Sequence, residues 1–370
     1  MELLTAVGSL LWVALMLLPW RPWSTRERLE PDEACDGTDL ADVTALIPAR
    51  NEGAVIERTL RALGREGNGL LVTLIDDQSS DGTASIARST LSTQLKIVQG
   101  DLLPAGWTGK LWALEQGWRG VDSELVLLLD ADIEIQPGML KALKRKLLDE
   151  KLALVSIMAQ LRMESFWEKL LVPAFVYFFK LLYPFAVGND PRSKLGVAAG
   201  GCILLRSDFL RMIGGFNALR SAIIDDCSLA RKIKDSGGRT WIGLSHSVRS
   251  HRAYTRLSNF WEMVERTAFT QLNYSSRLLL ATTFLMLLAF WLPWAGLLSR
   301  YLALRIAAIF GVSAMTLSYL PMLRYYRRSI FWAPMLPLIS GLYLLMTWSS
   351  ARRYWRGERS EWKGRVYARS

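Results

Sequence analysis

The sequence predicts an α/β domain on a mixed, mostly parallel sheet, with membrane-spanning helices at both ends of the chain. In the middle of the 370 residues, short apolar runs alternate with amphipathic helical segments. This pattern is typical of a sheet that has helices on both faces. Longer apolar runs near both ends approach the roughly 20 residues needed to cross a bilayer. The length allows about two domains.

The first apolar run covers residues 3–20 and predicts an N-terminal anchor. Basic residues follow this run, at Arg21, Arg26 and Arg28. Because a cleaved signal peptide has its basic residues before the apolar run, we expect the anchor to be retained. The positive-inside rule then places the N-terminus outside and the following domain in the cytoplasm.

Strands and helices are expected to alternate after a polar linker. We expect strands over residues 43–47, 70–75, 96–99 and 125–129. We expect helices over residues 51–66, 110–118 and 137–148, and another after the turn at 79–82. Asn51 is a candidate cap for the first helix, and Pro137 is expected near the first position of a later one.

Acidic residues stand where two of these strands end, which is where parallel sheets bind ligands. Asp130 and Asp132 follow the strand at 125–129, and Glu134 repeats their spacing. Two converging carboxylates suit Mg²⁺ or Mn²⁺, whose other positions are commonly filled by diphosphate oxygens. The alternative is a solvated turn. We therefore expect a divalent metal and a diphosphate here.

A second polar group predicts a nucleotide pocket. Asp76 and Asp77 follow the strand at 70–75, and residues 48–52 end the neighbouring first strand. A carboxylate at a strand tip can bind a nucleobase or a ribose. The alternative is an ordinary turn, because Asp, Ser and Gly are common turn residues.

Three further apolar runs predict membrane-spanning helices near the end of the chain. They cover residues 278–298, 303–323 and 330–349. With the central domain in the cytoplasm, the basic loop at 324–328 also lies inside. The basic tail would then lie outside, against the charge rule. Either the last segment is re-entrant, or the basic residues do not determine on which side of the membrane the C-terminal end lies.

The apolar segment 166–187 has two interpretations. It contains three charged residues, and Pro173 and Pro184 are expected to break it. It is either an interfacial helix lying against the lipid or a buried helix of the central domain.

The motifs together resemble those of the family 2 inverting glycosyltransferases, which have a GT-A fold. The resemblance covers residues 43–252 and is carried by an ordered series: Pro48-Ala49-Arg50-Asn51-Glu52, Asp76-Asp77-Gln78-Ser79-Ser80-Asp81-Gly82, Asp130-Ala131-Asp132 and Asp225-Asp226. The whole arrangement more narrowly resembles the hopanoid-biosynthesis-associated glycosyltransferases. The resemblance implies a hexosyltransferase-like enzyme with a nucleotide-sugar donor, a divalent metal, and a hopanoid or polyprenyl lipid as acceptor.

The resemblance also implies roles on the nucleotide side. Asp77 would contact the nucleobase, with Pro48, Arg50 and Glu52 beside it. Lys110 would face the nucleotide. The alternative for Lys110, a solvated lysine in the first turn of a helix, is disfavoured by the helix dipole.

At the reacting centre, the resemblance implies that Asp130 meets the ribose or the metal and that Asp132 ligates the metal. Asp226 would deprotonate the acceptor hydroxyl, with Asp225 orienting it. Repulsion between two adjacent carboxylates can raise one pKa towards a useful value. The alternative is that this pair caps a helix.

On the acceptor side, the glycines at 200–201 resemble a floor where the backbone can approach closely. Four residues are candidates for diphosphate or acceptor binding: Glu134, His251, Arg252 and Arg266. For His251 the alternative is a histidine that is simply hydrogen-bonded. The Q-x-x-R-W signature of processive synthases is absent near residues 260–272, which argues against a polymer-extruding enzyme.

We expect the chain to divide as follows: an anchor over residues 1–23, a linker over 24–42, a catalytic domain over 43–252, an interfacial helix over 253–277, about three membrane helices over 278–350 and a basic tail over 351–370. The protein is expected in the cytoplasmic (inner) membrane as a multi-pass protein. The catalytic domain is expected to face the cytoplasm.

Other functions can be weighed against this one. A nucleotidyltransferase would need a glycine- and lysine- or arginine-rich loop after the first strand, which residues 48–52 lack. A non-catalytic scaffold would not need Asp132 and Asp226 together, and the nearly uncharged C-terminal runs argue against transport. Much of the net charge of +11 lies beside the apolar runs, which favours a membrane over nucleic acid. The three cysteines form no C-x-x-C pair and are expected to be free thiols.

Overall fold

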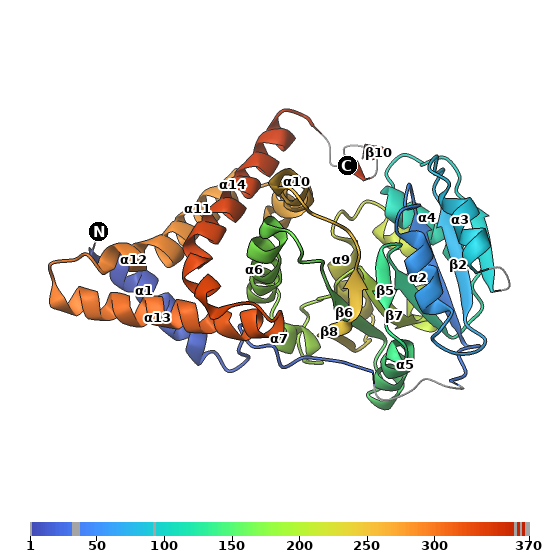
Figure 1. Cartoon of the computed structure of the whole chain (residues 1–370), viewed down its shortest axis with the longest axis horizontal. Coiled ribbons are helices and arrows are strands. Elements are labelled where there is room, and N and C mark those ends of the chain that lie inside the picture. The colour runs from blue at the N-terminus through green and yellow to red at the C-terminus, as the bar shows by residue number, and fades with distance from the viewer. Residues whose placement is uncertain (1, 32–37, 92–93, 359–360, 363–364, 367–370) are drawn as a thin grey trace. The chain divides into compact units, whose positions relative to one another are not determined.

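The computed structural model describes residues 2–31, 38–91, 94–358, 361–362 and 365–366. The chain divides into two compact units, both drawn in Figure 1. The helical unit comprises Met1–Arg26, Met163–Ala186 and Tyr254–Glu358. The sheet unit comprises Glu27–Arg162, Val187–Ala253 and Arg359–Ser370. Cys202 and Cys227 are free and buried, as expected, and Cys35 lies outside the described residues.

The sheet unit is built on eight strands in the order β3-β2-β1-β4-β7-β6-β8-β5. The strands are β1 (Val43–Ala49), β2 (Leu71–Asp76), β3 (Leu95–Gln99), β4 (Leu125–Leu129), β5 (Ile133–Ile135), β6 (Leu154–Gln160), β7 (Cys202–Arg206) and β8 (Thr240–Ser250). β1 is parallel to β2 and β4, and β2 to β3, whereas β7 is antiparallel to both neighbours. The prediction of a mixed, mostly parallel sheet is confirmed.

Helices cover both faces of this sheet. They are α2 (Ile56–Leu63), α3 (Thr83–Thr90), α4 (Gly109–Trp118), α5 (Met139–Asp149), α8 (Ser207–Met212) and α9 (Asp225–Asp235). Every residue of β4 is buried. Leu127 belongs to an apolar cluster with residues of α2 and α5, whereas Leu128 belongs to a second cluster with residues of α4 and α9. Because side chains alternate along a strand, the sheet has an apolar core on each face. Burial of each leucine contributes about 1.5–3 kcal/mol to the free energy of unfolding.

Two expected helix starts are wrong. α2 begins at Ile56, and Asn51 lies ahead of it with a φ of 52°. Asn51 Oδ1 accepts a hydrogen bond from the backbone N–H of Ser80, at 2.9 Å, so it supports the turn after β2 instead of capping a helix. α5 begins at Met139 after Gly138, whose φ of 86° ends the preceding turn. Pro137 therefore precedes the helix.

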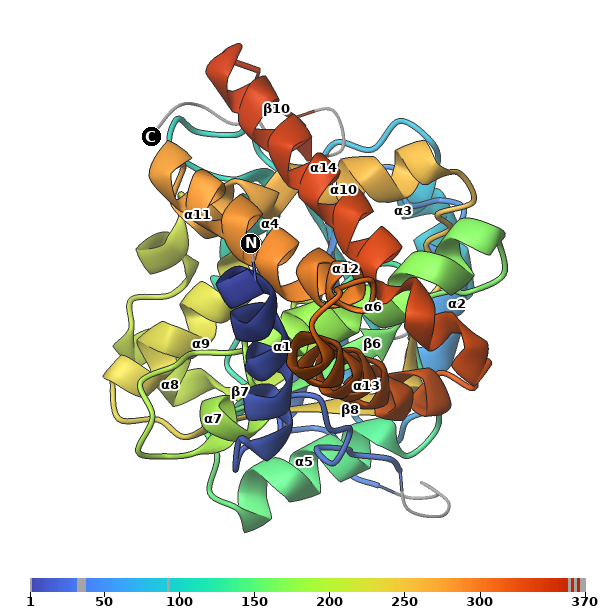
Figure 2. The same cartoon turned by 90° about the vertical axis from the view of Figure 1, so that its left-hand side faces the viewer.

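The helical unit contains α1 (Glu2–Leu17), α6 (Phe166–Leu182), α10 (Leu257–Ala268), α11 (Ser276–Met286), α12 (Leu292–Gly296), α13 (Leu302–Tyr325) and α14 (Leu336–Trp355). A π-helix joins α11 to α12, and the 3-10 helix η4 (Ile330–Met335) precedes α14. Figure 2 shows the unit from the side of α1. Three segments are long and apolar enough to cross a membrane: Ser276–Gly296, Leu302–Tyr325 and Ile330–Trp355. α1, with 16 residues, is shorter.

α6 lies in the chain between β6 and β7 but belongs to the helical unit. Its start is fixed by a capping box, in which the Ser165 hydroxyl accepts from the N–H of Glu168 and the Glu168 carboxylate accepts from the N–H of Ser165. Pro173 lies inside α6, so the expected break there is wrong. Burial of neighbours such as Leu171 and Val172 offsets the roughly 3 kcal/mol cost of an internal proline.

Small residues let α1 pack closely against α12 and α13. A Cβ atom on Gly296 would lie 2.5 Å from Thr5 Cγ2 and 2.9 Å from Ala308 Cβ. A Cβ atom on Gly311 would lie 2.6 Å from Ser9 Cα. Such contacts are typical of helix pairs in membranes. Because Thr5 lies near Ala308 and Ser9 near Gly311, α1 and α13 run in the same direction.

Candidate active site

The candidate site lies where β1, β2 and β4 end, because parallel strands bring their carboxyl ends to one edge of a sheet. Asp130 and Asp132 follow β4 directly. Asp132 is buried, and its Oδ2 accepts a hydrogen bond from Ser250 Oγ at 2.6 Å. The N–H of Asp130 donates to the carbonyl of Gly201 at 3.0 Å, which ties this turn to the start of β7.

Lys110 connects this turn to residues far along the chain. Its Nζ lies 2.7 Å from Asp130 Oδ1 and 3.8 Å from Asp225 Oδ2, and it donates to the carbonyl of Gly200 at 3.3 Å. Burial alone would lower the pKa of Lys110, but the carboxylates of Asp130 and Asp225 raise it. The lysine is therefore a fixed positive charge between two acidic motifs.

Asp225 and Asp226 form the first turn of α9. Asp226 Oδ2 accepts from the N–H of Gly200 at 2.9 Å, and Oδ1 accepts from the N–H of Cys227 at 2.7 Å. Burial, followed by the negative charge of Asp225, raises the pKa of Asp226 to about 7. Ile224 occupies the cap position of α9, so neither aspartate is its N-cap.

Gly200 lies close to the side chains where these groups meet. A Cβ atom at this position would lie 3.2 Å from Lys110 Nζ and 3.4 Å from Asp226 Oδ2. A pocket opens beside it. The pocket has polar walls formed by Lys110, Asp130, Asp225 and Asp226, and a floor that includes Leu114, Leu128, Ile203 and Phe216.

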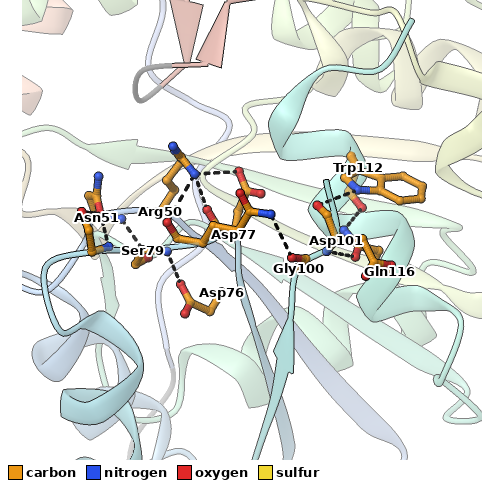
Figure 3. Close-up of polar contacts among 11 residues, drawn as sticks. Arg50, Asn51, Asp76, Asp77, Ser79, Gly100, Asp101, Trp112 and Gln116 are labelled. Atoms are coloured by element: carbon orange, nitrogen blue, oxygen red, sulfur yellow. Dashed lines mark hydrogen bonds and ion pairs between the residues drawn. The ribbon is translucent and has the colours of Figure 1, made fainter. Parts of the chain in front are cut away.

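The expected nucleotide side is drawn in Figure 3. Arg50 Nη1 donates to the carbonyl of Asp77 at 2.5 Å and lies 3.9 Å from Asp77 Oδ2. The N–H of Asp101 donates to Gln116 Oε1 at 2.7 Å, and Trp112 Nε1 donates to the carbonyl of Asp101 at 3.3 Å. These two bonds hold the loop after β3 against α4, and the N–H of Gly100 donates to the carbonyl of Asp76 at 2.9 Å.

Gly100 joins these two parts of the nucleotide side. A Cβ atom there would lie 3.1 Å from both Asp76 O and Asp77 Cα. Gln116, Trp112 and Gly100 belong to no motif that the sequence offers. Glutamine and tryptophan on an amphipathic helix more often pack in the core than bind a ligand, so their positions alone do not predict a role in the site.

Arg252 and His251 follow β8 and reach the same edge. Arg252 Nη2 lies 2.7 Å from Glu52 Oε1, and its Nε lies 3.4 Å from Asp132 Oδ2. His251 Nε2 contacts Glu134 Oε2, and its Nδ1 lies 3.3 Å from Arg58 Nη1.

Among the described residues, no group of three or more His, Cys, Asp or Glu side chains is arranged to hold a metal. Glu134 is engaged with His251 and does not form a three-carboxylate cluster with Asp130 and Asp132. Arg266 lies on α10, in the helical unit. Ser250 contacts Asp132 and Arg58 contacts His251, and the sequence predicts neither contact because Ser250 and Arg58 belong to no recognisable motif.

Residues 44–214, from β1 to just beyond α8, match the family model described as Glycosyl transferase family 2. The similarity to this family therefore covers just under half of the chain. The matched region includes Lys110, Asp130 and Asp132, whereas Asp225 and Asp226 lie beyond it.

Curated relatives of the chain match over part of their length. The 4,4'-diaponeurosporenoate glycosyltransferase of Staphylococcus haemolyticus is 29% identical over 113 residues, which cover 30% of each chain. The undecaprenyl-phosphate 4-deoxy-4-formamido-L-arabinose transferase of Pectobacterium carotovorum is 32% identical over 103 residues, which cover 27% of this chain and 31% of the relative. The chain thus spans about a third of the length of these relatives.

One solved structure matches the chain over most of its length. The mannosyltransferase PcManGT from Pyrobaculum calidifontis, in complex with GDP-Man and Mn²⁺, superposes with a TM-score of 0.55 at 18% identity. The match covers 97% of this chain and 99% of that one. The two chains therefore share a fold, which supports the expected GT-A architecture.

Proposed function

We propose that this chain is a membrane-bound inverting glycosyltransferase that moves a sugar from a nucleoside-diphosphate donor to a hydroxyl of a lipid acceptor. One observation carries the proposal: Asp130 and the Asp225–Asp226 pair, far apart in sequence, converge on Lys110 at a pocket. A parallel-sheet edge with acidic groups from two motifs suits a phosphate-bearing donor and a base.

The residues present fit a divalent cation. Asp130 and Asp132 are hard oxygen donors, and among the described residues Asp130 Oδ2 and Asp132 Oδ1 make no hydrogen bond or ion pair. Mg²⁺ and Mn²⁺ are commonly held by one or two carboxylates together with substrate phosphates. When bound, the cation would stabilise the negative charge of the leaving diphosphate.

Asp226 is the proposed base. Its carboxylate takes the proton from the acceptor hydroxyl, and that oxygen forms a bond to the anomeric carbon. The bond from this carbon to the diphosphate oxygen breaks on the opposite face, and its electron pair leaves with the diphosphate, which inverts the configuration. Two backbone N–H groups, from Gly200 and Cys227, hold the carboxylate in place. A pKa of about 7 suits a base that works near neutral pH.

Lys110 and the Asp77 region are proposed to bind the donor. Lys110 lies between Asp130 and Asp225 and would place positive charge beside the diphosphate. A buried Asp77 carboxylate beside the Arg50 guanidinium presents both an acceptor and a donor. This pair suits a base with a ring N–H next to a carbonyl, such as uracil, thymine or guanine. Pro48 and Glu52 are proposed to complete this side.

The acceptor is proposed to be a lipid. Three segments can cross a membrane, and the names of two relatives contain 4,4'-diaponeurosporenoate and undecaprenyl phosphate. A polyprenyl or hopanoid alcohol is the acceptor class to test. The protein is proposed to lie in the cytoplasmic membrane with the sheet unit inside, since basic residues follow α1.

The test uses the full chain purified in detergent with Mn²⁺ and UDP-, GDP- and dTDP-sugars. We expect one donor class to raise the melting temperature and to be hydrolysed slowly, and transfer to appear when polyprenyl or hopanoid alcohols are added. Asp226→Asn should abolish transfer but still bind the nucleotide. Asp235→Asn, at the exposed end of the same helix, should behave as wild type. Near-normal turnover of Asp226→Asn would rule out the assigned base.

A further inference from the structure

The path of the helical unit through a membrane follows from its own internal contacts. Three segments are long enough to cross, and if all of them crossed, the two ends of the region Ser276–Trp355 would lie on opposite sides. The contacts within the unit place those ends together instead.

The segments α11–α12 and α13 form a hairpin. They are joined by a short connection over residues 297–301, and a Cβ atom on Gly296 would lie 2.9 Å from Ala308 Cβ. If the chain crosses the membrane through α11–α12, it therefore returns through α13. Ser276 and Tyr325 then lie on the same side, which we call the arginine side.

The last segment both begins and ends on the arginine side. It begins at Ile330, five residues after the end of α13. Near its end, Trp348 Nε1 donates to Thr283 Oγ1 of α11 at 3.0 Å, and Ala351 is buried with Leu279. α14 therefore ends beside the first turns of α11.

A second set of contacts fixes the same end of α14 to α10. The Ser350 hydroxyl donates to the carbonyl of Glu265 at 2.5 Å and accepts from the N–H of Phe269 at 3.1 Å. Arg353 Nη1 lies 2.9 Å from Glu265 Oε2. Figure 1 shows α14 lying across the direction of α13, and Figure 2 shows α13 almost end-on while α14 extends across the view.

The charges agree with this arrangement. Seven arginines lie at the helix ends on the arginine side: Arg277, Arg324, Arg327, Arg328, Arg352, Arg353 and Arg356. The opposite ends carry two, Arg300 and Arg305. Because basic residues are retained in the cytoplasm, the arginine side is the cytoplasmic one. α1 runs in the same direction as α13, so the chain also leaves α1 on this side before it enters the sheet unit.

We propose that Ile330–Trp355 is a re-entrant segment, that the bilayer is crossed by α1, α11–α12 and α13, and that the C-terminal tail lies on the cytoplasmic side with the sheet unit. The exposed end of α14, with Arg352, Tyr354, Trp355 and Arg356, meets the headgroups of the inner leaflet. This arrangement of aromatic and basic residues suits an anionic lipid surface.

The test is labelling of single cysteines in the full chain with a membrane-impermeant maleimide, in a background with Cys35→Ser. Ser299→Cys reports the connection between α12 and α13, Ser329→Cys the connection before η4, and Ser370→Cys the tail. In intact spheroplasts we expect Ser299→Cys to be labelled at least five times as strongly as either of the other two variants. Ser329→Cys and Ser370→Cys should be labelled only after the membrane is permeabilised.

Two outcomes would overturn the inference. Labelling of Ser370→Cys in intact spheroplasts would show that the last segment crosses the bilayer. Protection of Ser299→Cys until permeabilisation would show that α11–α12 and α13 do not cross. Neither outcome depends on sugar transfer, so this topology stands or falls separately from the proposed enzymatic function.

Discussion

The pH dependence of transfer offers the sharpest test of the base. Burial and the adjacent Asp225 raise the pKa of Asp226 to about 7. A base works only in its ionised form, so the transfer rate should rise with pH through this value. With a pKa of about 7, about one tenth of the Asp226 carboxyls are ionised at pH 6 and about nine tenths at pH 8. We therefore expect kcat/KM to increase roughly tenfold between these pH values.

The assay is transfer to a defined lipid acceptor between pH 5.5 and pH 8.5 at saturating Mg²⁺. The variant Asp225→Asn removes the neighbouring negative charge, which is the second-largest cause of the raised pKa. Its profile should keep the same shape but have its midpoint at lower pH. A rate that is constant or falls as pH rises in the wild type would refute the reasoning, as would a midpoint that moves upward in Asp225→Asn.

Three other predictions concern the metal, the membrane helices and a buried acid. EDTA should abolish transfer by the wild type, and added Mn²⁺ should restore it. Asp132→Ala should be inactive even with excess Mn²⁺. Full activity in EDTA would contradict the metal assignment. Gly311→Leu should lower the melting temperature in detergent because its side chain would overlap Ser9, while Ala303→Leu, on an exposed face, should have little effect. Burial raises the pKa of Glu66 from 4.5 to about 7. Between these pH values the folded state keeps a proton that the unfolded state loses. The free energy of unfolding should therefore fall by about 3 kcal/mol as pH rises from about 4.5 to 7. The melting temperature of Glu66→Gln should lack this decline; parallel curves for the two proteins would show that Glu66 is not responsible.

The parts of the fold that could be predicted are those set by local pattern. β4 covers residues 125–129 as expected, because five consecutive apolar residues bounded by charged ones leave little choice of register. The rule that parallel strands bring their ends to one edge also anticipated that Asp130 and Asp77 would follow strands that end at the same edge of the sheet. The direction of β7 could not be predicted, because strand orientation depends on the whole sheet and not on the strand's own residues.

The parts of the site that escaped prediction depend on contacts between distant residues. Ser250 donates to Asp132 across 118 positions, and Arg58 reaches His251 across 193. Neither residue type carries a signal for such a role. The prediction that Asn51 caps a helix was wrong for a different reason. Asparagine is common both at helix caps and in left-handed turns, and only the start of α2 at Ile56 shows that Asn51 lies in a turn.

The position of α6 in the chain has a practical consequence for engineering and for biosynthesis. β6 and β7 pair in the sheet, yet the segment between them, Met163–Ala186, folds with the helical unit. A water-soluble fragment cannot be obtained by trimming the two termini alone, because the fragment would retain this apolar insert without its partners. Replacing the insert with a short glycine-rich connection is the rational starting point. During translation, α6 leaves the ribosome before α10 to α14, so we expect its apolar side chains to be made before their partners in the helical unit.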